Sequence, residues 1–203
     1  MTNTMKKDKF RKIKIQKVDP GQLNERLLLI NLYLTQGLTL FIGIIILFFQ
    51  KRSGIALLQF PENYRFLLWG CGLAAVMFGI DFLLSRFVKE ESLDDGGINE
   101  MLFRNRPIWH IAVICVVVSI CEELLFRGAI QHGIGPYWTS IIFALIHIRY
   151  LRHWIPTGWV FLSSYALGYI YIQTGTLWAP IVCHFLIDFI SGLVIKYRGG
   201  ENE

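Results

Sequence analysis

Long apolar runs separated by short polar segments follow one another along the chain and predict its helices. The first run, residues 27–49, is 23 residues long and carries no charge. A helix needs about 20 apolar residues to cross a bilayer, so this run predicts a membrane-spanning helix. It is too long for the core of a signal peptide, and no small-residue cleavage site follows it. Further apolar runs predict spans at 66–88, 108–126, 137–148, 155–172 and 177–195.

The expected fold is therefore all-α: a polytopic membrane helix bundle of about six transmembrane helices. The shortest run, 137–148, follows residues that favour a break in the helix, and we expect a short or re-entrant segment there. These residues are Gly128, Gly133, Gly135 and Pro136. The boundaries predict a basic N-terminal segment (1–26), two membrane helices with their loops (27–107), a functional membrane core (108–195) and a polar tail (196–203).

Composition and charge support a membrane protein and indicate its orientation. The chain is 54% hydrophobic, and its mean hydropathy of +0.46 is high for a soluble domain,. With the N-terminus in the cytoplasm, sixteen of the twenty Lys and Arg residues fall on the cytoplasmic side of six spans. This bias predicts an integral protein of the cell membrane with both termini cytoplasmic. Seven basic residues in the first seventeen positions favour contact with anionic membrane lipids over nucleic acid,.

Two adjacent glutamates stand at the end of the third apolar run, where an unpaired charge is costly. Glu123 and Arg127 are four positions apart, so they lie on one helix face and can pair,. Glu122 points about 100° away from that face and lacks this cationic partner. It therefore remains available as a proton acceptor, whereas two structural ion-pairing glutamates would be the alternative. The unpaired position of Glu122 argues against that alternative.

Two further polar pairs fall in apolar runs at helical spacing. Phe143 and His147 lie on one face of the fourth run, and His184 and Asp188 lie on one face of the last,. A histidine near a helix end is more often interfacial than catalytic, so the first pair is weak on its own. In the second pair, Asp188 can hold His184 in one tautomer, or both side chains can serve a proton relay or a metal.

The three patterns together resemble a known family. Glu-Glu-x-x-x-Arg at 122–127, Phe-x-x-x-His at 143–147 and His-x-x-x-Asp at 184–188 occur in this order on successive apolar runs. They resemble the motifs of the CPBP family, the CAAX-protease and bacteriocin-processing intramembrane endopeptidases, which include Rce1-like CAAX proteases. The resemblance covers roughly residues 108–195. It implies hydrolysis of peptide bonds in membrane-associated or lipidated peptides and proteins, which would be the partners of this chain.

The resemblance also implies roles for the residues of the first two motifs. Glu122, together with His147, would activate a water molecule for attack on the peptide carbonyl. Glu123, Arg127 and Phe143 would support the site.

The third motif departs from the family pattern and leaves its chemistry open. His184 would help to stabilise the oxyanion, but the position that is often Asn in the family is Asp188 here. An ionised Asp cannot donate a hydrogen bond, so Asp188 is either protonated, orients His184, or helps to bind a metal. The family has been described both as metal-dependent and as glutamate-dependent without metal. Zinc is a possible cofactor, with Glu122, His147 and His184 as candidate ligands, although no HExxH pattern is present,.

Two other functions are compatible with parts of this pattern. A non-proteolytic membrane regulator or bacteriocin-immunity protein could use the same scaffold, but the intact set of motif residues argues against it. A proton-coupled transporter could use the same ionisable residues, but no internal repeat supports it. The sequence therefore predicts a CAAX-protease-like membrane endopeptidase.

Overall fold

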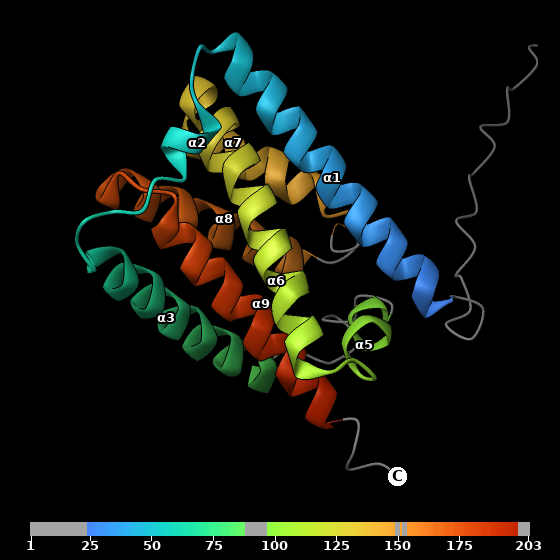
Figure 1. Cartoon of the computed structure of the whole chain (residues 1–203). Helices are drawn as coiled ribbons and strands as arrows, with labels where there is room; N and C mark the ends of the chain where they lie inside the picture. The colour runs from blue at the N-terminus through green and yellow to red at the C-terminus, as the bar shows by residue number, and fades with distance from the viewer. Residues whose placement is uncertain (1–23, 88–96, 149–150, 152–153, 199–203) are drawn as a thin grey trace, which may run out of the picture.

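The computed structural model describes residues 24–87, 97–148, 151 and 154–198. Most of the predicted basic segment and of the polar tail lies outside these ranges. The described part of the chain is a bundle of helices without strands (Figure 1). The predicted all-α class is confirmed.

Each predicted apolar run corresponds to a helix whose ends lie within a few residues of the prediction, except at the start of the fourth. The helices that correspond to these runs are α1 (Glu25–Phe49), α3 (Arg65–Phe87), α6 (Ile108–Glu123), α7 (Gln131–Ile146), α8 (Trp154–Thr174) and α9 (Trp178–Arg198). A short π-helix, η2 (Leu124–Ile130), joins α6 to α7. Two short helices, α2 (Gly54–Leu57) and α5 (Ile98–Phe103), lie where the sequence predicted loops.

Four helical segments in the described part of the chain are long and apolar enough to cross a membrane. They are Glu25–Phe49, Arg65–Leu83, Ile108–Ile146 and Trp178–Tyr197. The count is lower than the expected six because the third and fourth runs join into one kinked segment and because α8, although uncharged, is richer in polar and aromatic residues. The architecture is a polytopic helical membrane bundle.

The expected helix break between the third and fourth runs is confirmed at Gly135 and Pro136 and is wrong at Gly128 and Gly133. Gly128 and Gly133 do not end the helix; residues Leu124–Ile130 continue it as a π-helix, and α7 follows directly. The kink lies at Gly135, whose φ of 77° and ψ of 170° are non-helical. Glycine tolerates this φ, and Pro136 after it cannot donate its backbone nitrogen to the preceding turn.

The π-helix is held by the end of α1. A π-helical stretch shifts the backbone pairing, and such stretches are frequent at functional sites. Gln50 donates its side-chain amide to the carbonyl of Ala129 at 2.9 Å, and the Arg52 guanidinium donates to the carbonyl of Gly128. Gly43 of α1 lies so close to η2 that a Cβ there would be 3.4 Å from Cα of Leu125. Helix α1 and η2 therefore pack as neighbours.

Helix α9 is the centre of the bundle. It lies between α3 and α6 (Figure 1) and also contacts α8 and α5. Helices α3 and α9 approach closely at Gly70, where a Cβ would be 2.8 Å from the carbonyl oxygen of Ala179. Because α9 carries the third motif and contacts α6, this packing brings the third motif toward the first.

Candidate active site

Glu123 and Arg127 form the predicted ion pair, and both side chains are fully buried. Nη1 of Arg127 donates to Oε1 of Glu123 at 3.1 Å, and Nε lies 3.1 Å from Oε2. The pair thus has one hydrogen bond, from Nη1 to Oε1, and a second close charge contact between Nε and Oε2. Burying either charge alone in this setting would be far more costly than burying the pair.

Arg127 also connects the first motif to two other helices. Its Nη2 donates to the backbone carbonyl of Ser164 on α8 at 2.9 Å and lies 3.1 Å from the Ser164 hydroxyl. Its guanidinium lies over the ring of Phe143 on α7, 5.1 Å from the ring centre. A cation over an aromatic face is stabilised by the ring quadrupole. The arginine therefore fixes η2 against α7 and α8.

His184 joins the third motif to the first. Its Nδ1 lies 2.8 Å from Oε1 of Glu123, and its Nε2 lies 3.5 Å from Oδ2 of Asp188 one turn further along α9. Since the Glu123 carboxylate accepts, Nδ1 carries the proton in the first contact. Sequence reasoning predicted the Asp188 contact from the spacing, but not the contact with Glu123, because α9 and α6 are far apart in the chain.

Glu122 has a different environment from its neighbour. Its side chain is partly exposed, and its Oε1 accepts a hydrogen bond of 3.0 Å from Nε2 of Gln36 on α1. The expectation that Glu122 lacks the Arg127 partner holds, but the carboxylate is engaged by a neutral amide. Gln36 was missed by the sequence analysis. The sequence feature that could have identified Gln36 is its polar amide in the middle of an uncharged apolar run.

Phe143 and His147 share a face of α7, as the spacing predicted. The Phe143 ring lies 4.8 Å from that of Phe126, edge to face, and 4.4 Å from the imidazole of His147. Nδ1 of His147 lies 2.7 Å from the backbone carbonyl oxygen of Phe143. A carbonyl only accepts, so Nδ1 carries the proton, and in the neutral imidazole the lone pair is on Nε2. The structure therefore brings all three motifs into one chain of contacts.

The described residues do not form a zinc site. No three Asp, Glu, His or Cys side chains among them gather as a metal would require. Of the candidate ligands, His184 has both ring nitrogens next to carboxylates, Glu123 and Asp188. A zinc ligand of this kind would offer one of those nitrogens to the metal.

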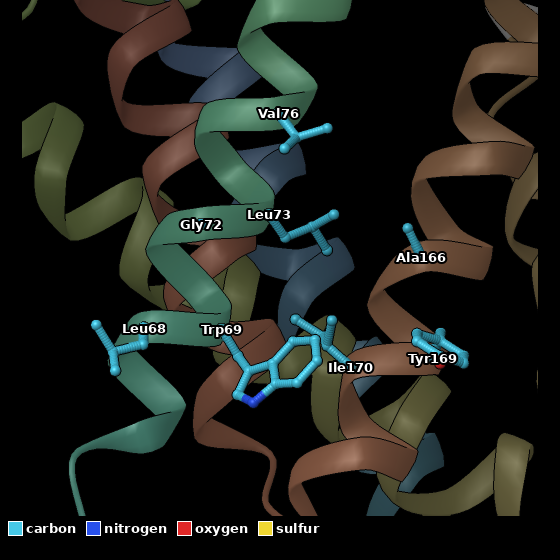
Figure 2. A pocket seen from close by; sticks show the side chains of 8 residues that line it. All are labelled: Leu68, Trp69, Gly72, Leu73, Val76, Ala166, Tyr169 and Ile170. Carbon is cyan, nitrogen blue, oxygen red and sulfur yellow. The ribbon is translucent and has the colours of Figure 1, made fainter.

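A cavity of about 560 Å³ lies apart from this cluster, between α3 and α8 (Figure 2). Its walls are apolar apart from the polar tips of two aromatic side chains. The lining residues are Leu68, Trp69, Gly72, Leu73, Val76, Ala166, Tyr169 and Ile170. None of the motif residues lines this cavity. The candidate active site is therefore the cluster of carboxylates and histidines, which lies elsewhere in the bundle.

Comparison with known proteins places the chain in a family. Residues 104–190, which include all three motifs, match the family described as type II CAAX prenyl endopeptidase Rce1-like. A Bacillus subtilis (strain 168) protein named "Uncharacterized protein YpbD" is 33% identical over 151 residues, which cover 74% of this chain and 80% of that protein. No solved structure matches the chain. Fold and site thus define a helical membrane protein of an endopeptidase family. The chain belongs to the Rce1-like family, and the predicted resemblance is confirmed.

Proposed function

We propose that this protein is an intramembrane endopeptidase that hydrolyses a peptide bond of a membrane-associated or lipidated peptide or protein. The observation that carries the proposal is the different environment of two adjacent carboxylates. Glu123 is fully buried and held by Arg127 and His184, whereas Glu122 is partly exposed and hydrogen-bonded to a neutral amide. No cation among the described residues pairs with Glu122, so its carboxylate is left to contact the reacting water as a general base,.

In the proposed reaction, Glu122 and His147 activate a water molecule. The water oxygen forms a bond to the carbonyl carbon of the peptide while its proton passes to Glu122. Nε2 of His147 is the ring nitrogen able to share the proton, because Nδ1 holds its own proton against the carbonyl of Phe143,. The C–N bond then breaks as this proton is delivered to the leaving amine.

His184 would stabilise the oxyanion that forms when water adds to the carbonyl. In this scheme the ring between Glu123 and Asp188 carries a proton on each nitrogen: Nδ1–H is held by Glu123, and Nε2–H can donate outward,. At 3.5 Å the contact of Nε2 with Asp188 is long for a hydrogen bond,. An oxyanion would take over this donor, and loss of one such donor typically lowers kcat by about 10²–10³-fold. Asp188 then acts by orienting and charging His184.

Glu123, Arg127 and Phe143 would keep the site in shape. The ion pair joins η2 to α8 and α9, and the Phe143 ring lies between Arg127 and His147. In this scheme the protein is placed in the cell membrane with both termini in the cytoplasm, as the distribution of basic residues predicts,.

The proposal is tested with the full-length protein purified in detergent. Wild type, Glu122→Ala and a control, Asp81→Asn, are incubated with a pool of membrane-tethered and prenylated CAAX peptides, with and without a chelator. Asp81 is a carboxylate of α3 outside the three motifs. The products are identified by mass spectrometry. Cleavage by wild type and Asp81→Asn that is lost in Glu122→Ala supports the endopeptidase, and loss on chelation would reveal a metal requirement. Identical peptide maps for wild type and Glu122→Ala would overturn the proposal and favour a non-proteolytic regulator or immunity protein.

A further inference from the structure

Gln36 is a buried amide in the middle of the first membrane helix. Its side chain is 7% exposed, and its Nε2 donates to Oε1 of Glu122 at 3.0 Å. Burying an amide among apolar helices is unfavourable unless its polar atoms are paired. The hydrogen bond links α1, which precedes the residues matched by the family model, to the carboxylate proposed as general base.

The other polar atom of this amide lacks a partner in the described structure. Oε1 of Gln36 is buried and accepts no hydrogen bond from any described group. An unpaired buried acceptor costs about 1–3 kcal/mol, and in the bilayer bulk water is not at hand to pair it. Since Oε1 has no partner that would hold it, the hydrogen bond that fixes this amide is the one from Nε2 to the Glu122 carboxylate.

Two other glutamines help to define what is special about Gln36. Gln50 and Gln131 also leave a buried Oε1 unpaired, but each donates its amide to a backbone carbonyl, of Ala129 and Gly168 respectively. Those two bonds join helix to helix. Among these three glutamines, Gln36 is the one whose amide donates to an ionisable side chain.

We infer that Gln36 is a positioning residue that orients the Glu122 carboxylate toward the attacking water. Its N–H holds Oε1 of Glu122, so the carboxylate keeps one orientation and presents its other oxygen to the water that attacks the substrate carbonyl. This inference rests on the proposed function, and it adds α1 to the catalytic unit.

Helix α1 is held firmly enough for this role. Gly43 allows its backbone to lie against Leu125 of η2, and Gln50 and Arg52 at its end donate to η2 carbonyls. All three contacts are made with the π-helix that directly follows Glu123. The distance between Gln36 and Glu122 is thereby fixed by neighbouring contacts, and even a 1 Å misplacement at a reacting centre can lower the rate by about 10²-fold.

The kinetic test uses the full-length protein in detergent with an internally quenched, prenylated CAAX peptide. Gln36→Met has a similar volume but no amide, Gln36→Asn keeps a shortened amide, and Gln173→Met, the same change at an exposed glutamine of α8, is the matched control. We expect Gln36→Met to lower kcat by about ten- to a hundredfold with little change in KM. Gln36→Asn should recover part of the loss, and Gln173→Met should keep the kcat of wild type. Wild-type kcat in Gln36→Met would overturn the inference and leave the proposed function standing.

Thermal unfolding separates positioning from a structural role. Because Gln36→Met removes an unpaired buried oxygen, its melting temperature should equal or exceed that of wild type. Gln50→Met leaves the Ala129 carbonyl without its donor and should melt at a lower temperature. A fall in both kcat and melting temperature of Gln36→Met, with the same fall in Gln50→Met, would overturn the inference in favour of a packing role.

An infrared measurement tests the hydrogen bond between Gln36 and Glu122 without any substrate. The carboxylate band of Glu122 is assigned from the difference between wild type and Glu122→Gln and is then followed in Gln36→Met and Gln50→Met. A shift in Gln36→Met alone supports the inference. If wild type cleaves no peptide, the proposed function fails, and this band still tests the Gln36–Glu122 contact. An unshifted band in Gln36→Met overturns it.

Discussion

Nδ1 of His184 lies 2.8 Å from Oε1 of Glu123, so residues 61 positions apart are joined by one hydrogen bond. The same oxygen accepts from Nη1 of Arg127. Glu123 is thus a fully buried carboxylate shared by a guanidinium and an imidazole from two different segments. This sharing gives the two adjacent glutamates different environments: Glu123 joins three segments, and Glu122 remains available for the proton transfer proposed above.

Arg127→Met is expected to destabilise the protein strongly. It removes the cation from a fully buried pair and leaves Glu123 with His184 alone, and breaking such a pair costs about 3–5 kcal/mol,. The free energy of unfolding can be measured by denaturant titration in mixed micelles. Glu123→Gln should destabilise for the converse reason, since it leaves Arg127 buried beside a neutral amide.

An exposed pair on α5 provides the control for this prediction. Arg104 and Glu100 lie 3.0 Å apart, with Glu100 exposed and Arg104 partly exposed, so Arg104→Met should cost no more than about 1 kcal/mol,. Equal losses of unfolding free energy in Arg104→Met and Arg127→Met would show that the buried ion pair does not stabilise the bundle more than an exposed one.

Asp188→Asn is expected to retain activity, whereas Asp188→Leu should lose it. Asparagine can donate a hydrogen bond to an oxyanion directly, and the family often has it at this position. Leucine can neither donate to the oxyanion nor orient His184, so kcat should fall by about 10²-fold or more. Rates with the prenylated CAAX peptide check this. An Asp188→Leu variant as active as wild type would remove Asp188, and its effect through His184, from the mechanism.

Much of the fold and the local side-chain pairs could be predicted from the sequence because they depend on short spacings. Six apolar runs correspond to helices, and three i,i+4 pairs form: Glu123 with Arg127, Phe143 with His147, and His184 with Asp188. Helical periodicity alone places such residues on one face.

The contacts between segments could not be predicted in this way. The Glu123–His184 and Gln36–Glu122 bonds depend on which helices become neighbours, and no spacing within one helix encodes that. The π-helix was missed because glycines predict a break in a helix. Gly128 is instead buried in a continuous helix, and its backbone carbonyl accepts a hydrogen bond from Arg52. Here tertiary contacts override the local preference of glycine.

Phe143→Leu is expected to affect both stability and rate. The ring contacts the Arg127 guanidinium, Phe126 and His147, and leucine removes the cation–π and edge-to-face contacts. The loss should be about 1–3 kcal/mol of unfolding free energy. Because His147 loses its ring neighbour, kcat should also fall. Trp138→Leu, which alters an exposed aromatic of the same helix, is the control and should leave kcat unchanged. Unchanged kcat in Phe143→Leu would show that the ring does not position His147.

Gly70→Ala and Gly79→Ala should have different effects, although both glycines lie on α3. At Gly70 a Cβ would lie 2.8 Å from the carbonyl oxygen of Ala179, a backbone atom of α9 that cannot move aside easily. Overpacking of this kind costs about 1–3 kcal/mol. At Gly79 a Cβ meets nothing within 4 Å, so alanine should be neutral or stabilising, as its higher helix propensity favours,. Thermal unfolding in detergent distinguishes the two, and since α9 carries His184, Gly70→Ala should also lower the rate. A Gly70→Ala variant as stable and active as Gly79→Ala would mean that α3 does not constrain the position of α9.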